Sequence, residues 1–297
     1  MGWAMTSQLR TSLLLILLLS ASAFSQESKT KFTYKSLRVP GSSSTGPTGV
    51  NNLGDIVGSF SSNGVGAGFL YSAGTFETIA CPGASSTTAN AINDSGVIVG
   101  SCQFSGTSLQ GFIYQNGTYT YVNYPKAKLT SLNGINNQGE VVGEYYIETD
   151  SYHGFLYSNG TFTVLGTKGT TLSAINNAGM IAGNACINVD QCSAGEGVVY
   201  VKGPTRSKLQ ETVMYPGSTG TGLTGINDNG DLAGSWGPTP NGQQEGFVFI
   251  KATNTFAGFD IKKSGDMSIN GINNSGEIVG FYTVGTAFYG FHGQVSQ

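Results

Sequence analysis

The chain has 297 residues and a formal net charge of −3, and only 10% of its residues are charged. Nucleic-acid binding calls for a basic surface stripe, so this composition argues against a nucleic-acid partner. The 45 glycines, with many Asn residues and few strong helix formers, predict a chain that turns often and an all-β fold.

The first 25 residues have the pattern of a secretory signal peptide. Arg10 supplies the only charge, an apolar run follows at 13–19, and small residues occupy 20–23. The apolar run is shorter than the ~20 residues that a bilayer span needs, which disfavours the alternative of an uncleaved anchor. We therefore expect cleavage after Ala23 or Ser25 and a secreted mature chain, extracellular or periplasmic, without a membrane span.

One phrase, Asn-Asn/Asp-x-Gly, recurs six times in the rest of the chain. Its closing glycines are Gly54, Gly96, Gly139, Gly179, Gly230 and Gly276, and the steps between them are 42, 43, 40, 51 and 46 residues. Each copy continues into a short apolar stretch that ends in Gly, such as 55–58. A near-constant period of this length indicates a repeat architecture.

The recurring phrase predicts a tight hairpin turn. Asn at its first position can hydrogen-bond back to the backbone, and Gly at its fourth position tolerates a positive φ. A second turn follows in the clearest copies, where 114–119 and 157–162 place Asn-Gly between alternating apolar residues. This dipeptide is a strong hairpin signal. Ala73-Gly74 takes its place in the first copy, and longer segments do so at 202–204 and 251–254.

Each repeat is therefore predicted to hold four strands, which in the second repeat we expect at 89–93, 97–104, 111–115 and 118–124. Four-stranded units of ~40–45 residues have the size of propeller blades. The sixth repeat lacks a fourth strand after 289–292, whereas residues 32–39 precede the first repeat and match a fourth strand. We predict an all-β, six-bladed β-propeller, one domain over 26–297, in which strand 32–39 completes the last blade and closes the ring. The repeats start near residues 46, 89, 132, 172, 223 and 269.

All four cysteines follow the predicted signal peptide, and an even number in an exported chain predicts two disulfides. Cys81 ends the fourth strand of the first blade and Cys102 ends the second strand of the next, so we pair these two. Cys186 and Cys192 bracket one loop, and we pair them as well. The alternative is that the thiols are free and buried. Their spacing does not suit a zinc site, and we expect neither a metal nor a cofactor.

At these residues the chain resembles the probable extracellular repeat, or HAF-repeat, family of bacterial exported proteins. The shared pattern is G-I-N-x-x-G-x-I-V-G followed by G-F-L-Y-x-N-G-T-F, and it covers nearly the whole chain after residue 25. The naming triplet His-Ala-Phe is altered, reading Ala-Gly-Phe at 67–69 and His-Gly-Phe at 153–155. The resemblance implies the fold and an exported location. It brings no activity and no catalytic residues.

The variable segments of the repeats predict which face binds a partner. In a four-stranded meander, the connections from the second to the third strand, and from the fourth strand to the next blade, share one face. The variable segments lie there, at 60–67, 104–110, 145–153, 185–196, 236–245 and 281–289. Insertions that gather on one face of a repeat protein often form its binding face, so we assign the binding surface to this side.

Aromatic residues on this face are the candidate ligand contacts, because aromatic rings can stack on sugars or peptides. A recurring position, two residues after the Gly that closes the second strand, is aromatic in four of the six repeats. The alternative for these side chains is packing between blades. The candidate binding residues are Phe60, Tyr145, Tyr146, Tyr152, His153, Trp236, Phe281 and Tyr282.

The function that we expect is non-catalytic binding of an extracellular glycan, peptide or protein by a monomer. A hydrolase or lyase is the alternative, and it would need carboxylates such as Glu144, Asp150, Glu196 and Glu245 to converge at the propeller mouth. No G-x-S-x-G, H-E-x-x-H or phosphate-binding motif occurs. A third possibility is a structural envelope protein that binds no small ligand.

Overall fold

A computed structural model describes residues 32–104, 108–148, 151–186, 195–203, 207–237, 242–259, 261 and 264–295. Within these ranges the chain forms strands and turns and no helix. The all-β prediction is confirmed for this part of the chain. The predicted signal peptide, 1–25, lies outside it.

The strands are short and follow one another closely along the chain. They are β1 (Phe32–Leu37), β2 (Ser44–Val50), β3 (Ile56–Ser62), β4 (Val65–Ser72), β5 (Thr75–Ile79), β6 (Ser86–Ile92), β7 (Ile98–Gln103), β8 (Leu109–Gln115), β9 (Thr118–Val122), β10 (Leu129–Ile135), β11 (Val141–Tyr146), β12 (Tyr152–Ser158), β13 (Thr161–Leu165), β14 (Thr170–Ile175), β15 (Met180–Cys186), β16 (Gly195–Val201), β17 (Lys208–Val213), β18 (Gly220–Ile226), β19 (Leu232–Gly237), β20 (Glu245–Ile250), β21 (Thr255–Gly258), β22 (Met267–Ile272), β23 (Glu277–Val284) and β24 (Ala287–Val295).

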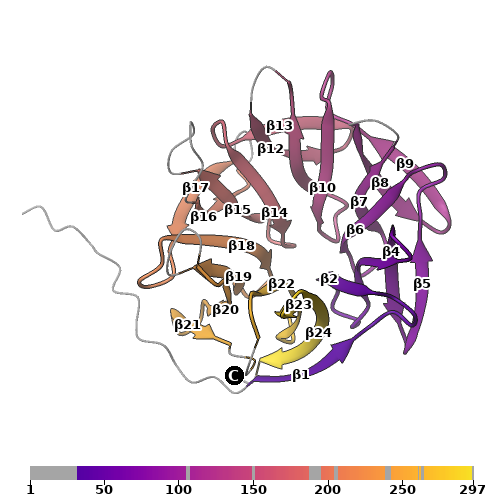
Figure 1. Cartoon of the computed structure of the whole chain (residues 1–297). Coiled ribbons are helices and arrows are strands. Elements are labelled where there is room, and N and C mark those ends of the chain that lie inside the picture. The colour runs from indigo at the N-terminus through magenta and orange to yellow at the C-terminus, as the bar shows by residue number, and fades with distance from the viewer. Residues whose placement is uncertain are drawn as a thin grey trace, which may run out of the picture.

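Consecutive strands pair antiparallel in groups of four, which we call units one to six. Units one (β2–β5), two (β6–β9) and three (β10–β13) share one twelve-stranded sheet, in which single parallel pairings join neighbouring units. Units four (β14–β17) and five (β18–β21) form separate four-stranded sheets. Figure 1 shows the units arranged around a common centre, and the first strand of every unit lines that centre.

Unit six combines strands from the two ends of the chain. β22, β23 and β24 are followed in this sheet by β1, which pairs antiparallel with β24 from Phe32 opposite Val295 to Leu37 opposite Gly290 (Figure 1). The predicted pairing of the 32–39 segment with the last strand is thus confirmed, with the strand ending at Leu37.

The recurring Asn-Asn/Asp-x-Gly phrase forms the turn between the first and second strands. In unit one, Asn51 Oδ1 accepts hydrogen bonds from the amides of Leu53 at 3.0 Å and Asp55 at 2.9 Å. Gly54 closes the turn with a φ of 82°, a conformation that favours glycine. The bond from the fifth residue back to the first Asn recurs in the other five units.

The core lies where neighbouring units meet, and one large side chain on the third strand dominates it. Phe69, Phe112, Phe155, Phe247 and Phe291 are fully buried, and Val198 takes this place in unit four. Each ring covers the glycine of the second strand. A Cβ on Gly58 would lie 2.7 Å from the Phe69 ring and 2.3 Å from a carbonyl oxygen, so the close strand approach requires glycine there.

The first strand of each unit begins earlier than the sequence predicts. In unit two β6 begins at Ser86, whereas an apolar pattern starts only at Ala89. Thr87 is 3% exposed, and its hydroxyl oxygen accepts a hydrogen bond from the Cys81 amide at 2.9 Å, which offsets the cost of burying it. A buried hydroxyl with this bond extends the strand without an apolar residue, which a hydropathy pattern does not reveal.

Candidate functional site

The antiparallel order gives the molecule two different ends. The turns after the first and third strands of each unit lie at one end, which we call the turn end. The connections after the second and fourth strands lie at the other, which we call the loop end. The two ends differ in how their polar groups are used.

Side chains at the turn end form two rings of hydrogen bonds around the centre. The first Asn of each turn donates from Nδ2 to the carbonyl of its counterpart in the next unit, as Asn51 does to Asn93 at 3.2 Å. The series continues through every unit and ends with Asn273 donating to Asn51 at 2.9 Å. A second series joins each amide at the next turn position to the side chain of the following unit, and Asn274 donates back to Asn52 at 2.9 Å.

The polar side chains of the turn end are hydrogen-bonded to one another, and Asp94 is an example. Burial alone would raise the pKa of its carboxyl, but hydrogen bonds from the side chains of Asn52 and Asn137 and from the Asn52 amide lower the pKa overall. The two hollows on the central axis have volumes of about 80 and 70 Å³. Small-molecule sites typically measure ~300–1,000 Å³, so this end offers no room for an organic ligand in those hollows.

The loop end carries a larger hollow of about 380 Å³ where units six, one and two meet. The beginnings of β2 and β6 and the end of β3 form most of its wall, and β4, β23 and β24 complete it. Its lining residues are Ser44, Thr45, Gly46, Ser59, Phe60, Ser61, Gly66, Ser86, Thr87, Thr88, Phe281 and Phe288.

Aromatic rings form one side of this hollow. Phe281 and Phe288 face each other with centroids 5.5 Å apart, and Phe288 is 51% exposed. Phe60 is half-buried and packs against the core cluster of Leu37, Ile56 and Phe69. Phe60 and Phe281 were predicted as ligand contacts, and the structure brings these two together.

Serine and threonine residues, with Gly46 and Gly66, make up the rest of the lining, and their hydroxyls fall into two classes. Thr45 and Thr87 accept backbone hydrogen bonds from Val39 at 3.1 Å and Cys81 at 2.9 Å. The others make no side-chain hydrogen bond to a described residue, and they are Ser44, Ser59, Ser61, Ser86 and Thr88. None of the described residues that line the hollow carries a charged side chain.

The predicted residues of unit three form a separate aromatic surface at the loop end. Tyr146 and Tyr152 are opposite each other in the β11–β12 pair, with centroids 5.3 Å apart. Tyr152 is 41% exposed, whereas Tyr145 is 6% exposed. Tyr145 lies between Tyr124, at 3.6 Å and nearly parallel, and His153, at 5.2 Å.

The recurring aromatic position therefore lies at the contacts between units. Trp236 stacks on Tyr215 at 4.2 Å and 8°, and its buried Nε1 has no hydrogen-bond partner among the described residues. Tyr282 packs against the core cluster of units five and six and stacks on Tyr289 at 5.4 Å. Packing between units, the alternative considered for this position, is the arrangement seen at Tyr145 and Trp236.

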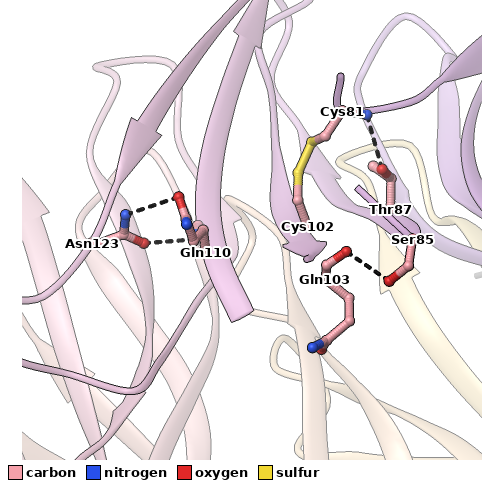
Figure 2. Close-up of a disulfide and its surroundings, with 8 residues drawn as sticks. Cys81, Ser85, Thr87, Cys102, Gln103, Gln110 and Asn123 are labelled. Carbon is pink, nitrogen blue, oxygen red and sulfur yellow. Dashed lines mark hydrogen bonds between the residues drawn. A yellow bond between two sulfur atoms is a disulfide. The ribbon is translucent and has the colours of Figure 1, made fainter. Parts of the chain in front are cut away.

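At the same position unit two carries Cys102, which forms the predicted disulfide with Cys81 (Figure 2). Their Cα atoms are 6.2 Å apart, and the Cys81 amide is bonded to Thr87 beside them. Cys186 is also disulfide-bonded. Its predicted partner, Cys192, lies outside the described residues, so that pairing stays a prediction.

The carboxylates of the hydrolase alternative lie on different units. Glu144 is on β11, Glu196 on β16 and Glu245 on β20, and Asp150 lies outside the described residues. Burial raises the pKa of Glu144, which makes no hydrogen bond or ion pair to a described residue. The described residues contain no cluster of three His, Cys, Asp or Glu side chains that could hold a metal.

Sequence reasoning missed Phe288 and the unbonded hydroxyls. One signal was present in the residue that follows the second-strand glycine. It is Ser59, Ser101, Glu144, Asn184 and Ser235 in units one to five, but Phe281 in unit six. A single aromatic residue at an otherwise polar position marks the unit that carries the hollow.

Comparison with solved structures identifies the fold. A gluconolactonase from Xanthomonas campestris matches at 12% identity and a TM-score of 0.54, covering 91% of this chain and 92% of its own. The β-propeller domain of a protease from Pyrococcus furiosus, described as having an open velcro topology, matches at 12% identity and a TM-score of 0.51. The match covers 84% of this chain and 81% of that domain's chain. A lectin from Aleuria aurantia, in complex with Fucα1-6GlcNAc, matches at 9% identity and a TM-score of 0.50. The match covers 89% of this chain and 91% of the lectin.

These likenesses show a β-propeller fold and nothing finer. No protein-family model and no curated protein matches the chain. Within the described ranges, the structure holds no helix with the length and apolar character that a membrane crossing requires.

Proposed function

We propose that this protein is a secreted or periplasmic six-bladed β-propeller that binds an extracellular glycan, peptide or protein at its loop end without catalysis. Each unit is one blade, and β1 completes the sixth. The two hydrogen-bond series at the turn end support a closed ring, because each runs through six units and returns from Asn273 or Asn274 to unit one.

The hollow at the loop end is the observation that carries the binding function. Its volume of about 380 Å³ lies within the range of small-molecule sites. Its lining offers an exposed phenyl ring at Phe288 and five hydroxyls that make no side-chain hydrogen bond to a described residue, whereas the turn-end asparagines bond to one another. Polar groups that the fold leaves unpaired are available to a ligand.

An exported location is supported by two features. The Cys81–Cys102 disulfide is of a kind that persists in oxidising compartments and is rare in the cytosol. The first 25 residues have the signal-peptide pattern, and the resemblance to the HAF-repeat family favours the same location. Membership of that family is part of the proposal.

Two exposed apolar residues at opposite ends provide the test. Phe288 is 51% exposed at the loop end, and Leu53 is 72% exposed in a turn at the other end. The parent chain is screened against extracellular glycans, peptides and proteins, and the affinity of each hit is measured for Phe288→Ala and Leu53→Ala by calorimetry. We expect Phe288→Ala to weaken binding about tenfold, the loss of one aromatic anchor, and Leu53→Ala to leave it within about twofold.

Equal effects of the two variants would contradict the assignment of the loop end. Failure of every class of ligand to bind the parent would overturn the binding function itself.

Hydrolysis is the second candidate, and Glu144 is the residue that favours it. A carboxyl whose pKa burial has raised is protonated at higher pH and can act as a general acid. The check is turnover of chromogenic glycosides and esters by the parent and by Glu144→Gln. Turnover that is lost in Glu144→Gln, with unchanged binding, would establish this candidate in place of the first.

A further inference from the structure

We propose that the loop-end hollow is a binding site for one uncharged sugar residue, which stacks on Phe281 and Phe288 and hydrogen-bonds to the hydroxyl wall. This inference rests on the proposed binding function and adds the chemical class of the ligand, its location and its stoichiometry.

The aromatic side supplies the apolar half of the recognition. A pyranose ring has a face made of C–H groups, and covering that face with an aromatic ring removes apolar surface from both partners. Phe281 is half-buried and so held in place, and Phe288 stands 5.5 Å from it with about half of its surface in water. A side chain that is anchored by its neighbour loses little freedom when a ligand covers it.

The hydroxyl side supplies the polar half. Ser44 lies directly opposite Ser61 in the β2–β3 pair, and Ser59 lies opposite Gly46 two residues further along. Ser86 and Thr88 line the hollow from β6. Each hydroxyl donates one hydrogen bond and accepts up to two, which matches the hydroxyls of a sugar, since those also donate and accept.

The absence of charge decides between neutral and acidic sugars. Among the described residues that line the hollow, none carries a charge at neutral pH. A carboxylated or phosphorylated sugar would lose hydration of its anion on entering and would find no cation in this wall to replace it. A neutral sugar meets no such cost.

Only one blade provides the site. The position of Phe281 is Ser, Glu or Asn in the other five blades, so the aromatic side cannot be repeated around the ring. We therefore expect one sugar bound per chain.

Gly46 offers a direct way to fill the hollow. A Cβ added there would meet only a carbonyl oxygen at 3.9 Å, and the backbone has no positive φ, so Gly46→Leu projects into open space without strain. Gly222 is its register counterpart in unit five, opposite Ser235 as Gly46 is opposite Ser59. Its added Cβ would have its nearest neighbour at 3.6 Å, which makes Gly222→Leu the matched control.

The experiment titrates the parent and both variants with two pairs of sugars, glucose against glucuronic acid and galactose against galacturonic acid, and with N-acetylglucosamine. Thermal melting confirms that each variant is folded. We expect at least one neutral sugar to bind with a stoichiometry of one, its acidic counterpart to bind at least tenfold more weakly, and Gly46→Leu but not Gly222→Leu to abolish binding. The same sugars displayed on an array by their reducing ends distinguish a terminal residue of a larger glycan from a free sugar.

An acidic sugar that binds as tightly as its neutral partner would overturn this inference, and so would neutral-sugar binding that survives in Gly46→Leu. If no neutral sugar binds at millimolar concentration while a peptide or protein binds and loses affinity in Phe288→Ala, the sugar assignment falls and the proposed function stands. If nothing binds at all, both fall.

Discussion

The contact between units one and two and the contact between units four and five are made at the same strand positions by different kinds of side-chain pair. At the first, Cys81 and Cys102 form a disulfide. At the second, Tyr215 and Trp236 stack at 4.2 Å. The surroundings are the same, because the amides of Cys81 and Tyr215 each donate to a threonine hydroxyl, at 2.9 and 2.8 Å.

The backbone arrangement is therefore the same at the two contacts, whereas the pair of side chains that meets there differs. A third contact, between units two and three, repeats it with the Tyr124–Tyr145 stack, where the Tyr124 amide donates to Thr130 at 3.1 Å. An aromatic pair stabilises the folded state through buried area. A disulfide acts mainly by restricting the unfolded chain. The two kinds of contact should therefore respond differently to substitution.

The largest effect is expected from Tyr145→Ala. Tyr145 is 6% exposed and is stacked on Tyr124, so truncation leaves a cavity and costs about 3–5 kcal/mol in the free energy of unfolding. Urea unfolding followed by circular dichroism measures it. Tyr152→Ala, at the exposed neighbouring position, is the control and should cost less than about 1 kcal/mol. Similar losses in both variants would show that the stack contributes nothing of its own.

Removal of the disulfide should have the next largest effect. The double substitution of Cys81 and Cys102 by Ala opens a covalent loop with a sequence separation of 21, and this should cost about 2–4 kcal/mol. Because the effect acts through the unfolded chain, the denaturant m-value should rise, whereas Tyr145→Ala should leave it unchanged. An unaltered free energy of unfolding would mean that the side-chain packing at this contact suffices without the bond.

Trp236→Phe is expected to cost only about 1 kcal/mol. Phe keeps an aromatic ring over Tyr215 and loses some packed area, but it also removes a buried Nε1–H that has no partner among the described residues, and an unsatisfied donor is itself costly. Unfolding by urea is compared with that of Trp236→Ala. A cost for Phe as large as the cost for Ala would indicate that the indole nitrogen is bonded after all.

The smallest effect is expected at the residue that follows the second-strand glycine, which is Glu144 in unit three and Asn184 in unit four. Asn184 bonds to the amide and the carbonyl of Leu223 in the following unit, whereas burial raises the pKa of Glu144. Because the folded pKa exceeds the unfolded value of ~4.3, stability falls as pH rises through the interval between the two. Glu144→Gln should match the parent near pH 4 and exceed it at pH 7.5.

Chemical unfolding at both pH values tests this expectation. Asn184→Asp is the mirror control, since it places a charge at the same kind of position, and it should lower stability at pH 7.5. A difference between Glu144→Gln and the parent that does not change with pH would contradict the assignment of a penalty to the ionised carboxylate.

Most of the architecture was readable from local patterns. The six Asn-Asn/Asp-x-Gly phrases are the turns between first and second strands, and the Asn-Gly pairs are the next turns, with positive φ at both Asn116 and Gly117. The pairing of the first strand with the last and the Cys81–Cys102 bond were also predicted. The early start of strands such as β6, at Ser86, was missed, because it depends on a buried threonine hydroxyl and not on an apolar pattern.

The candidate site was predicted only in part. Its placement at the loop end followed from topology, and Phe60 and Phe281 line the hollow. Phe288, Ser86 and the other unbonded hydroxyls were missed, because residues of β2, β6 and β24 approach one another only when the units surround a centre. The sequence separations between these residues do not indicate that they lie close together in the fold.

By itself the sequence determined the repeat, the turns and the strand type, because those depend on what single residues permit: a positive φ at glycine, a back-bonding amide at asparagine, and alternation along a strand. Only the tertiary structure decided which aromatic rings pack and which meet solvent. The reason is physical, since Tyr145, Trp236 and Phe60 occupy the same strand position, and the neighbouring unit determines whether the ring stacks on a partner or lines an open hollow.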